Sequence, residues 1–307
     1  MGRFMQLSKA RLSVLVTLTT LAGFIVASPG GIDWTRLMWA VLGTLLAAAG
    51  ANSFNQWLEV RADAKMIRTR NRPLPANRMS STQALAFAVG VSIIGLGILC
   101  RGANPLTAGL ALFNIVLYGW VYTPLKYKNP LCTLVGAVNG AIPPMMGWTA
   151  ATGELGWGAW LLGGLLFTWQ IPHFLALAWL YREDYARGGF KMLPAVDPEG
   201  LITRRITLIY SLAIIPICLT LFLSGLVGLY FALGALILGV ALVISAVRLY
   251  GEASSKNARR LFLGGLAQLF LLIVLMAADR PLVHQPLPQV VEPLAYSIEV
   301  APDVNLP

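Results

Sequence analysis

Three oxygen-bearing side chains follow one another at helical spacing within residues 52–78. Asn55, Glu59 and Asp63 are four residues apart, so on a helix they share one face. Two carboxylates and an amide on successive turns can bind a divalent cation such as Mg²⁺. Cations that could bind phosphate oxygens follow directly; they are Lys65, Arg68, Arg70, Arg72 and Arg78. The same charges could instead belong to a cytoplasmic loop that only sets membrane topology.

A second charged stretch, residues 181–191, combines the same kinds of residue. Two tyrosines and two acids, Tyr181, Glu183, Asp184 and Tyr185, precede a basic pair and a glycine pair, Arg187, Gly188, Gly189 and Lys191. Carboxylates, cations and a flexible turn therefore occur together, as they do in the first stretch. We interpret the two stretches as parts of one site.

A third candidate element is the pair Tyr122 and Lys126 in the segment YTPLK. Their spacing of four residues would direct both side chains to the same place on a helix, although Pro124 disturbs a regular helix there. Taken alone, the pair is more typical of an interfacial tyrosine and a lysine that sets topology.

The elements that must position these residues are membrane-spanning helices. The 307 residues are 57% hydrophobic and 12% charged, whereas soluble domains contain about 25% charged residues. A span needs about 20 mainly apolar residues. Nine segments meet this requirement approximately: residues 12–28, 37–57, 83–100, 105–123, 130–150, 157–180, 206–225, 227–247 and 261–278.

Lysine and arginine are distributed unevenly between the predicted loops. If the amino terminus is inside, only Arg36, Arg101 and Arg280 of the 23 Lys and Arg residues fall outside. This asymmetry predicts a cytoplasmic amino terminus and a periplasmic carboxyl terminus. The amino terminus lacks the features of a transit peptide, which favours a bacterial inner (plasma) membrane. The basic residues lie between apolar runs in a lipid bilayer protein, and we expect no nucleic acid partner.

The two acidic stretches follow the second and the sixth apolar segments, so four helices separate them and both face the cytoplasm. We therefore predict an all-α polytopic membrane protein with nine transmembrane helices. Two four-helix halves plus a ninth helix would surround a central cavity that opens to the cytoplasm. Residues 1–280 would form a single membrane-embedded domain, and residues 281–307 a Pro-rich, mobile tail.

An apolar helix bundle with a charged mouth suits a substrate that has a diphosphate head and an apolar tail. Metal ions and cations stabilise the charge that develops when an allylic diphosphate ionises. An apolar cavity keeps the resulting carbocation away from water. A transporter with intramembrane carboxylates is the rival from another class, but the acids lie at one membrane face and outline no path through the membrane.

A resemblance to a known family favours an enzyme over a transporter. The first charged stretch reads NQWLEVRADAKMIRTRNRPLP and resembles the Asn-x-x-x-Asp-x-x-x-Asp signature of UbiA-type intramembrane prenyltransferases. Over essentially its whole length the chain is similar to the haem-directed members, the protoheme IX farnesyltransferases (haem O synthases), because it also contains YTPLK and WQIPHFLALAWLYREDYARGGFKMLP.

This resemblance implies a transferase that moves the farnesyl group of farnesyl diphosphate to the vinyl group of haem b, with water addition, giving haem O and diphosphate. It implies Mg²⁺ as cofactor, and haem A synthase or the terminal oxidase assembly as partners. A prenyltransferase for an aromatic quinone precursor is the alternative within the family. The PHF and YREDYARGG segments favour the haem-directed members.

The resemblance also implies roles for individual residues. The catalytic set would be Asn55, Glu59, Asp63, Tyr122, Lys126 and Asp184. The metal ligands would be Asn55, Glu59, Asp63 and Asp184. The diphosphate would contact Lys65, Arg68, Arg72, Arg187 and Lys191. Two positions depart from the family pattern, because Glu59 replaces an aspartate and Gly188 stands where an acid is expected.

A histidine, His173, lies in the sixth apolar segment beside Gln170 and Pro172. A buried neutral histidine that bonds to a neighbouring helix is the simpler interpretation. Imidazole is also a common axial ligand of haem iron, which makes His173 a candidate to bind the farnesyl acceptor.

Overall fold

Long helices make up most of the computed structural model, which describes residues 2–281 and contains no strand within them. The long helices are α2 (Ala10–Val26), α3 (Trp34–Leu58), α5 (Ser81–Gly102), α6 (Pro105–Val116), α8 (Cys132–Thr152), α9 (Trp157–Leu180), α12 (Leu201–Leu223), α13 (Leu229–Gly251) and α14 (Ser255–Ala278). A π-helical turn η1 (Leu117–Tyr122) and the short α7 (Thr123–Leu125) continue α6. The predicted tail lies, from residue 282 on, outside the described residues.

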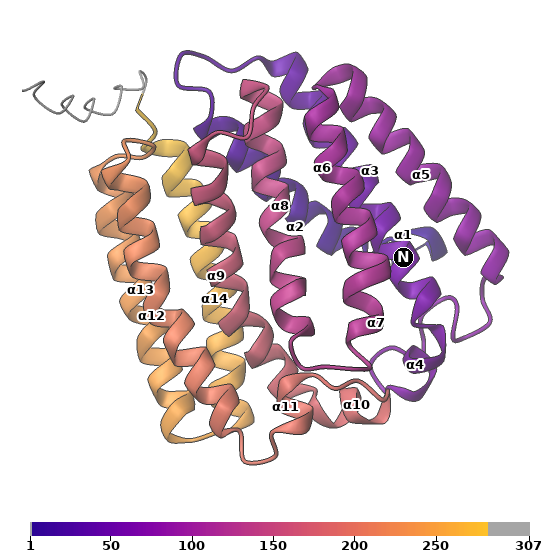
Figure 1. Ribbon diagram of the computed structural model, residues 1–307. Helices are drawn as coiled ribbons and strands as arrows, with labels where there is room; N and C mark the ends of the chain where they lie inside the picture. Colours follow the sequence, from indigo (N-terminus) through magenta and orange to yellow (C-terminus); the bar gives the residue numbers. More distant parts are fainter. Residues whose placement is uncertain (1, 282–307) are drawn as a thin grey trace, which may run out of the picture.

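Four short helices are additional to the predicted spans. They are α1 (Arg3–Leu7), α4 (Val60–Lys65), α10 (Arg182–Arg187) and α11 (Leu193–Val196). Helices α4, α10 and α11 gather at one end of the bundle (Figure 1). Because α4 follows α3 and α10 follows α9, both charged stretches lie at this end and are partly helical.

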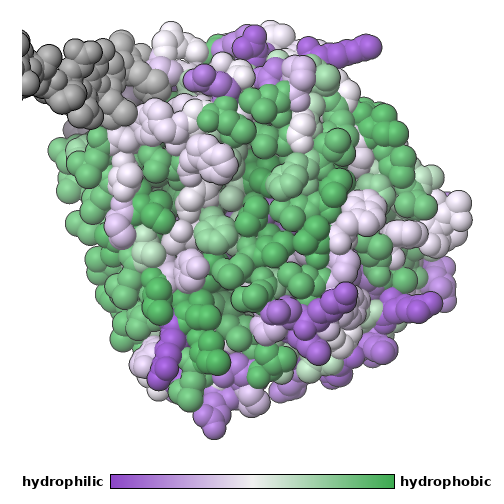
Figure 2. All heavy atoms as spheres, viewed as in Figure 1, coloured by the Kyte–Doolittle hydropathy of each residue, from purple (hydrophilic) through white to green (hydrophobic). Residues whose placement is uncertain are grey.

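The predicted membrane-spanning character agrees with the structure. Seven of the described helices are long and apolar enough to cross a membrane. Helix α2 has 17 residues and is shorter, and α8 is not among the seven. Figure 2 shows apolar residues across the middle of the visible face and hydrophilic residues toward its two ends. The all-α polytopic fold is confirmed, whereas the count of nine spans stays a prediction.

The long helices pack as two similar halves. In the first half α3 packs against α2, α5 and α6; in the second half α9 packs against α8 and α12, and α12 packs against α13. Helix α14 packs against α13, α9 and α2, so it joins the two halves as the predicted ninth helix (Figure 1). Helices α2 and α8 meet between the halves.

The contact between α2 and α8 requires two glycines. A Cβ atom added at Gly23 would overlap the carbonyl of Pro144, and one added at Gly147 would overlap the carbonyl of Thr20. The Thr20 hydroxyl also donates a hydrogen bond to Pro143 O at 3.0 Å. The backbones of the two helices therefore touch, and this contact fixes the position of α8 beside the central cavity.

We expect the Gly147→Val substitution to destabilise the protein, because its side chain has no room against the α2 backbone. Overpacking of this kind costs about 1–3 kcal/mol. Thermal unfolding of the purified protein in detergent measures the effect. Gly90→Val is the matched control, since a Cβ atom at Gly90 meets nothing within 4 Å. Equal unfolding temperatures for the two variants would contradict the close contact.

Candidate active site

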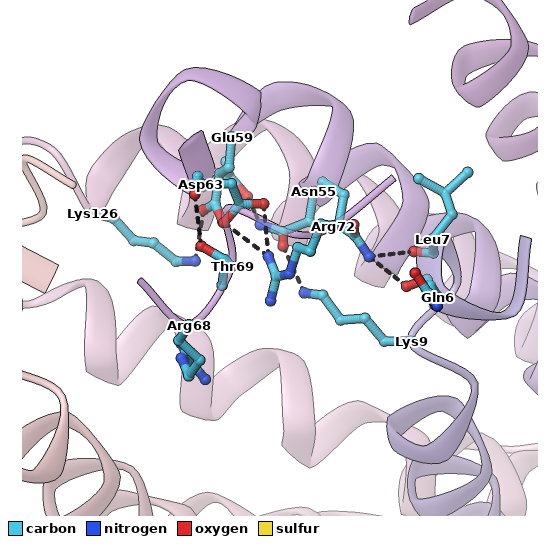
Figure 3. Close-up of polar contacts among 12 residues, drawn as sticks. Gln6, Leu7, Lys9, Asn55, Glu59, Asp63, Arg68, Thr69, Arg72 and Lys126 are labelled. Atoms are coloured by element: carbon cyan, nitrogen blue, oxygen red, sulfur yellow. Dashed lines mark hydrogen bonds and ion pairs between the residues drawn. The ribbon is translucent and has the colours of Figure 1, made fainter. Parts of the chain in front are cut away.

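The three side chains of the first charged stretch line one cavity, as their spacing predicts. Asn55 lies in the last turn of α3, Glu59 lies between α3 and α4, and Asp63 lies in α4. Their exposed fractions are 0%, 3% and 0%. The cavity has a volume of about 200 Å³ and all three residues line it. Figure 3 shows these side chains together with the cations that surround them.

Each of these three side chains is paired with a cation. Glu59 Oε1 accepts a hydrogen bond from Lys126 Nζ at 2.6 Å. Both Asp63 oxygens accept from Arg72 Nη1, at 2.9 and 2.7 Å. Lys9 Nζ donates to Asn55 Oδ1 at 2.8 Å. Because a buried charge is costly without a partner, these contacts offset the cost of burying the two carboxylates.

The two lysines of the cavity differ in their tendency to lose a proton. Burial, together with the nearby Arg72 guanidinium, lowers the pKa of Lys9 to about 7. Burial acts in the same direction on Lys126, but the Glu59 carboxylate outweighs it and raises the pKa of Lys126 above its ordinary value. Lys126 therefore holds its proton more tightly than Lys9 does.

The π-helical turn η1 carries aromatic and hydroxyl groups into the same cavity. Asn55 Nδ2 donates to Thr123 Oγ1 at 3.0 Å, and this hydroxyl donates to Tyr118 O at 2.8 Å. The rings of Tyr118 and Tyr122 stack with centroids 5.3 Å apart. Lys126 Nζ lies 4.6 Å from the centroid of the Tyr122 ring. The predicted proximity of Tyr122 and Lys126 is therefore confirmed.

Two of the five cations assigned to the diphosphate line the cavity. They are Arg68 and Arg72. The Arg68 guanidinium lies 4.7 Å from the centroid of the Tyr181 ring and donates to Tyr185 Oη at 3.2 Å. The other three are exposed and do not line the cavity; they are Lys65, Arg187 and Lys191. Their role in diphosphate binding stays a prediction.

Asp184 holds the first charged stretch in place. Its Oδ1 accepts a hydrogen bond from Ile67 N, and its Oδ2 accepts one from Arg68 N, both at 3.0 Å. Arg187 Nη2 donates to Oδ1 at 2.6 Å. Burial opposes ionisation of Asp184, but the two amides and Arg187 lower its pKa below the ordinary value. Asp184 does not line the cavity, so its geometry fits a residue that positions Arg68, and its metal-ligand role stays a prediction.

His173 lies where α9 packs against α14. Its ring stacks between Trp169 and Phe262, with centroid distances of 4.8 and 4.5 Å. Its Nδ1 has no hydrogen-bond partner among the described residues. His173 lines neither this cavity nor a second cavity that adjoins it. Its surroundings match a packing role, and the structure does not bring it to the cavity as a haem ligand would require.

A second cavity continues the first one toward the middle of the bundle. Its volume is about 190 Å³, and we call it the inner chamber. The two cavities share five lining residues; they are Leu12, Tyr118, Tyr122, Gly136 and Phe174. The inner chamber is lined mainly by apolar and small side chains of α2, α3, α6, α8 and α9. The first cavity, which we call the charged mouth, thus leads into a more apolar space.

Sequence spacing does not identify several residues of this site. Lys9 lies 46 positions before Asn55, and Thr123 lies 68 positions after it. Neither residue is part of the two charged stretches whose spacing predicts the site. Lys9 adopts a left-handed backbone conformation with φ of 47° at the start of α2, which no feature of the sequence indicates.

Comparison with known proteins identifies the family. The model of the family described as "UbiA prenyltransferase family" matches residues 16–274. The chain belongs to the UbiA prenyltransferase family. This UbiA-family protein is 40% identical over 290 residues to the protoheme IX farnesyltransferase of Solibacter usitatus, which covers 92% of the chain and 99% of the relative. It is 45% identical over 275 residues to the mitochondrial protoheme IX farnesyltransferase of Homo sapiens, which covers 90% of the chain and 61% of the human protein.

A solved structure shares the fold of this UbiA-family protein. It is a UbiA homologue from Archaeoglobus fulgidus bound to GPP and Mg²⁺, with a TM-score of 0.65 and 13% sequence identity. The similarity covers 90% of the chain and 99% of that structure. The helical arrangement described above is therefore the UbiA fold.

We expect Glu59→Gln to lower the thermal stability of the protein, because it leaves the buried Lys126 without its carboxylate. Breaking a buried ion pair costs about 3–5 kcal/mol. The double variant Glu59→Gln/Lys126→Met should recover most of this loss. Arg36→Gln is the control, since the Arg36–Asp33 pair is exposed and such pairs contribute about 0–1 kcal/mol. A stable single variant would mean that Lys126 does not depend on Glu59.

Proposed function

We propose that this protein transfers the farnesyl group of farnesyl diphosphate to the vinyl group of haem b, with water addition, giving haem O and diphosphate. The observation that carries this proposal is 40% and 45% identity, over most of the chain, to two proteins named protoheme IX farnesyltransferase. The charged mouth and the inner chamber support it, because a diphosphate head and an apolar farnesyl tail need these two environments.

The charged mouth contains four cations that could receive the diphosphate; they are Lys9, Arg68, Arg72 and Lys126. The side chains of three of them, Lys9, Arg72 and Lys126, already contact Asn55, Asp63 and Glu59. When a metal–diphosphate complex binds, the ligands would turn to the metal and the cations would turn to the phosphate oxygens. This exchange of partners leaves no buried charge without a counter-charge, so substrate binding avoids the large cost of an unpaired ion.

The donor atoms at the mouth fit Mg²⁺. Asn55, Glu59 and Asp63 offer only oxygen atoms, which hard cations prefer. Within residues 2–281 no group of three His, Cys, Asp or Glu residues could hold a metal. We infer that the diphosphate and water complete the coordination, as they commonly do for Mg²⁺. When bound, Mg²⁺ would stabilise the negative charge on the leaving diphosphate.

The rest of the chemistry is electrostatic and depends on the chain's own residues. Lys126 and Arg72 would stabilise the leaving group from fixed positions. The stacked rings of Tyr118 and Tyr122 line both cavities, and their faces would stabilise the allylic cation. The apolar walls of the inner chamber would keep bulk water from this cation.

The distribution of charge supports a place for the protein in the membrane. We propose a multi-pass protein of the bacterial inner membrane with a cytoplasmic amino terminus and a periplasmic carboxyl terminus. The charged mouth would then open to the cytoplasm, where farnesyl diphosphate and Mg²⁺ are available. Haem A synthase or the terminal oxidase assembly would receive the product.

Incubation of the purified protein with haem b, farnesyl diphosphate and Mg²⁺ without oxygen should yield haem O, as mass analysis of the haem can show. Asn55→Ala and Asp63→Ala should each reduce turnover by about 100-fold or more, because loss of one oxygen ligand removes several kcal/mol of leaving-group stabilisation.

Glu183→Ala is the matched control for these two variants, since Glu183 is an exposed acid outside the cavity. It should keep wild-type turnover. Full activity of folded Asp63→Ala protein would remove Asp63 from the site. A wild-type protein that prenylates an aromatic acid and leaves haem b unchanged would favour the other branch of the family.

We expect His173→Ala to lower thermal stability and to leave the absorption spectrum of bound haem unchanged. The reason is that His173 packs between two aromatic rings and does not line the cavities. Spectra of haem b titrated into the wild-type and variant proteins provide the measurement. A changed iron spectrum, together with a raised KM for haem and a normal KM for farnesyl diphosphate, would instead support axial ligation.

A further inference from the structure

Four amide side chains line the inner chamber, each from a different helix: Asn52 from α3, Asn114 from α6, Asn139 from α8 and Gln170 from α9. Asn139 and Gln170 are 7% and 5% exposed. The Oδ1 atoms of Asn114 and Asn139 accept no hydrogen bond from any described residue. Buried amide oxygens are nearly always paired in folded proteins. These oxygens therefore need a donor that the described residues do not supply.

The backbone of α8 adds acceptors at the same level. Pro143 and Pro144 lie inside this helix. Proline has no amide hydrogen, so the carbonyls of Asn139 and Gly140 lose the donors that a regular helix would give them. The side chain of Asn139 offers only a long contact from Nδ2 to Val135 O, at 3.4 Å. This turn of α8 is therefore rich in acceptors and poor in donors.

Gln170 brings a further oxygen to this turn. Its Nε2 donates to Leu166 O at 2.9 Å and to Ala137 O at 3.3 Å. These contacts orient the amide so that its Oε1 lies against Gly140, where a Cβ atom would overlap it. Glycine at position 140 thus allows the amide of α9 to approach the donor-poor turn of α8.

A group of oxygens without donors selects a particular kind of ligand. It repels phosphate and carboxylate groups, and it favours a molecule that donates hydrogen bonds or carries positive charge. The remainder of the inner chamber is mainly apolar. In the reaction proposed above, the water that supplies the hydroxyl group of haem O is a small molecule that can donate such hydrogen bonds.

We propose that Asn139 and Gln170 bind this water beside the vinyl group of haem b, an inference that rests on the proposed function. The C–O bond of farnesyl diphosphate breaks and diphosphate leaves with the electron pair. The vinyl π electrons form a C–C bond to the farnesyl carbon, which leaves a cation on the vinyl carbon next to the ring. A lone pair of the bound water forms the C–O bond, and the proton released from this water passes to diphosphate.

The position of the water decides the product. Without a bound water, the same cation would lose a proton from the neighbouring carbon and form an alkene, with the proton again on diphosphate. This product is lighter than haem O by one water molecule. The ratio of alkene to haem O therefore reports on the water site, whereas the sum of the two reports on farnesyl transfer.

The test uses the purified full-length protein with haem b, farnesyl diphosphate and Mg²⁺ without oxygen, and mass analysis of both products. Asn139→Leu and Gln170→Met remove the oxygens at similar side-chain size. Each should raise the ratio of alkene to haem O by about tenfold or more, the size expected for the loss of one or more hydrogen bonds. Asn139→Gln keeps an amide and should restore part of the wild-type ratio.

Val16→Leu is the matched control, because it changes the volume of the same chamber without removing an oxygen. It should reduce total farnesylation and leave the ratio unchanged. Haem O as the sole product of a folded Asn139→Leu or Gln170→Met protein would overturn the proposal, as would an equal shift in Val16→Leu. A wild-type protein that forms neither product would show instead that the proposed function itself is wrong.

Discussion

The pairing of buried acceptors with cations is the constraint on which the charged mouth depends. Glu59 and Asp63 are almost completely inaccessible, and an isolated carboxylate in such a place would not stay ionised. Their partners Lys126 and Arg72 come from different segments. The end of α3, the loop after α4 and the end of α7 must therefore meet at one point. The same requirement brings three cation-paired side chains, Asn55, Glu59 and Asp63, to one cavity.

The two cavities place a polar environment next to an apolar one. Ion pairs concentrate at the end of the bundle, and small and apolar side chains line the space behind them. Tyr118 and Tyr122 border both spaces and stack on each other. Their position follows from η1, because a π-helical turn displaces the residues that follow it relative to a regular α-helix. A local irregularity in one helix thus marks the boundary between the polar and the apolar environments.

Patterns of hydropathy and residue spacing in the sequence predicted the features of this protein that repeat along a single helix. Hydropathy gave the long helices, and the spacing of Asn55, Glu59 and Asp63 gave one face of the cavity. Contacts between distant segments followed no such pattern: Lys9 meets Asn55 across 46 positions, and Asp184 meets Ile67 across 117. The short helices also escaped prediction, because so few residues carry no clear period. The sequence indicated Asp184 as a candidate site residue. It did not indicate that the backbone amides of Ile67 and Arg68 donate hydrogen bonds to this carboxylate.

The hydrogen bonds from Ile67 and Arg68 to Asp184 have a consequence for biosynthesis. The two amides belong to the first half of the chain and the carboxylate belongs to the second. Four long helices, α5, α6, α8 and α9, lie between them in the sequence. A ribosome that has made only the first half releases a loop whose Arg68 is not yet anchored. The charged mouth can therefore take its final shape only after α9 and α10 have been synthesised.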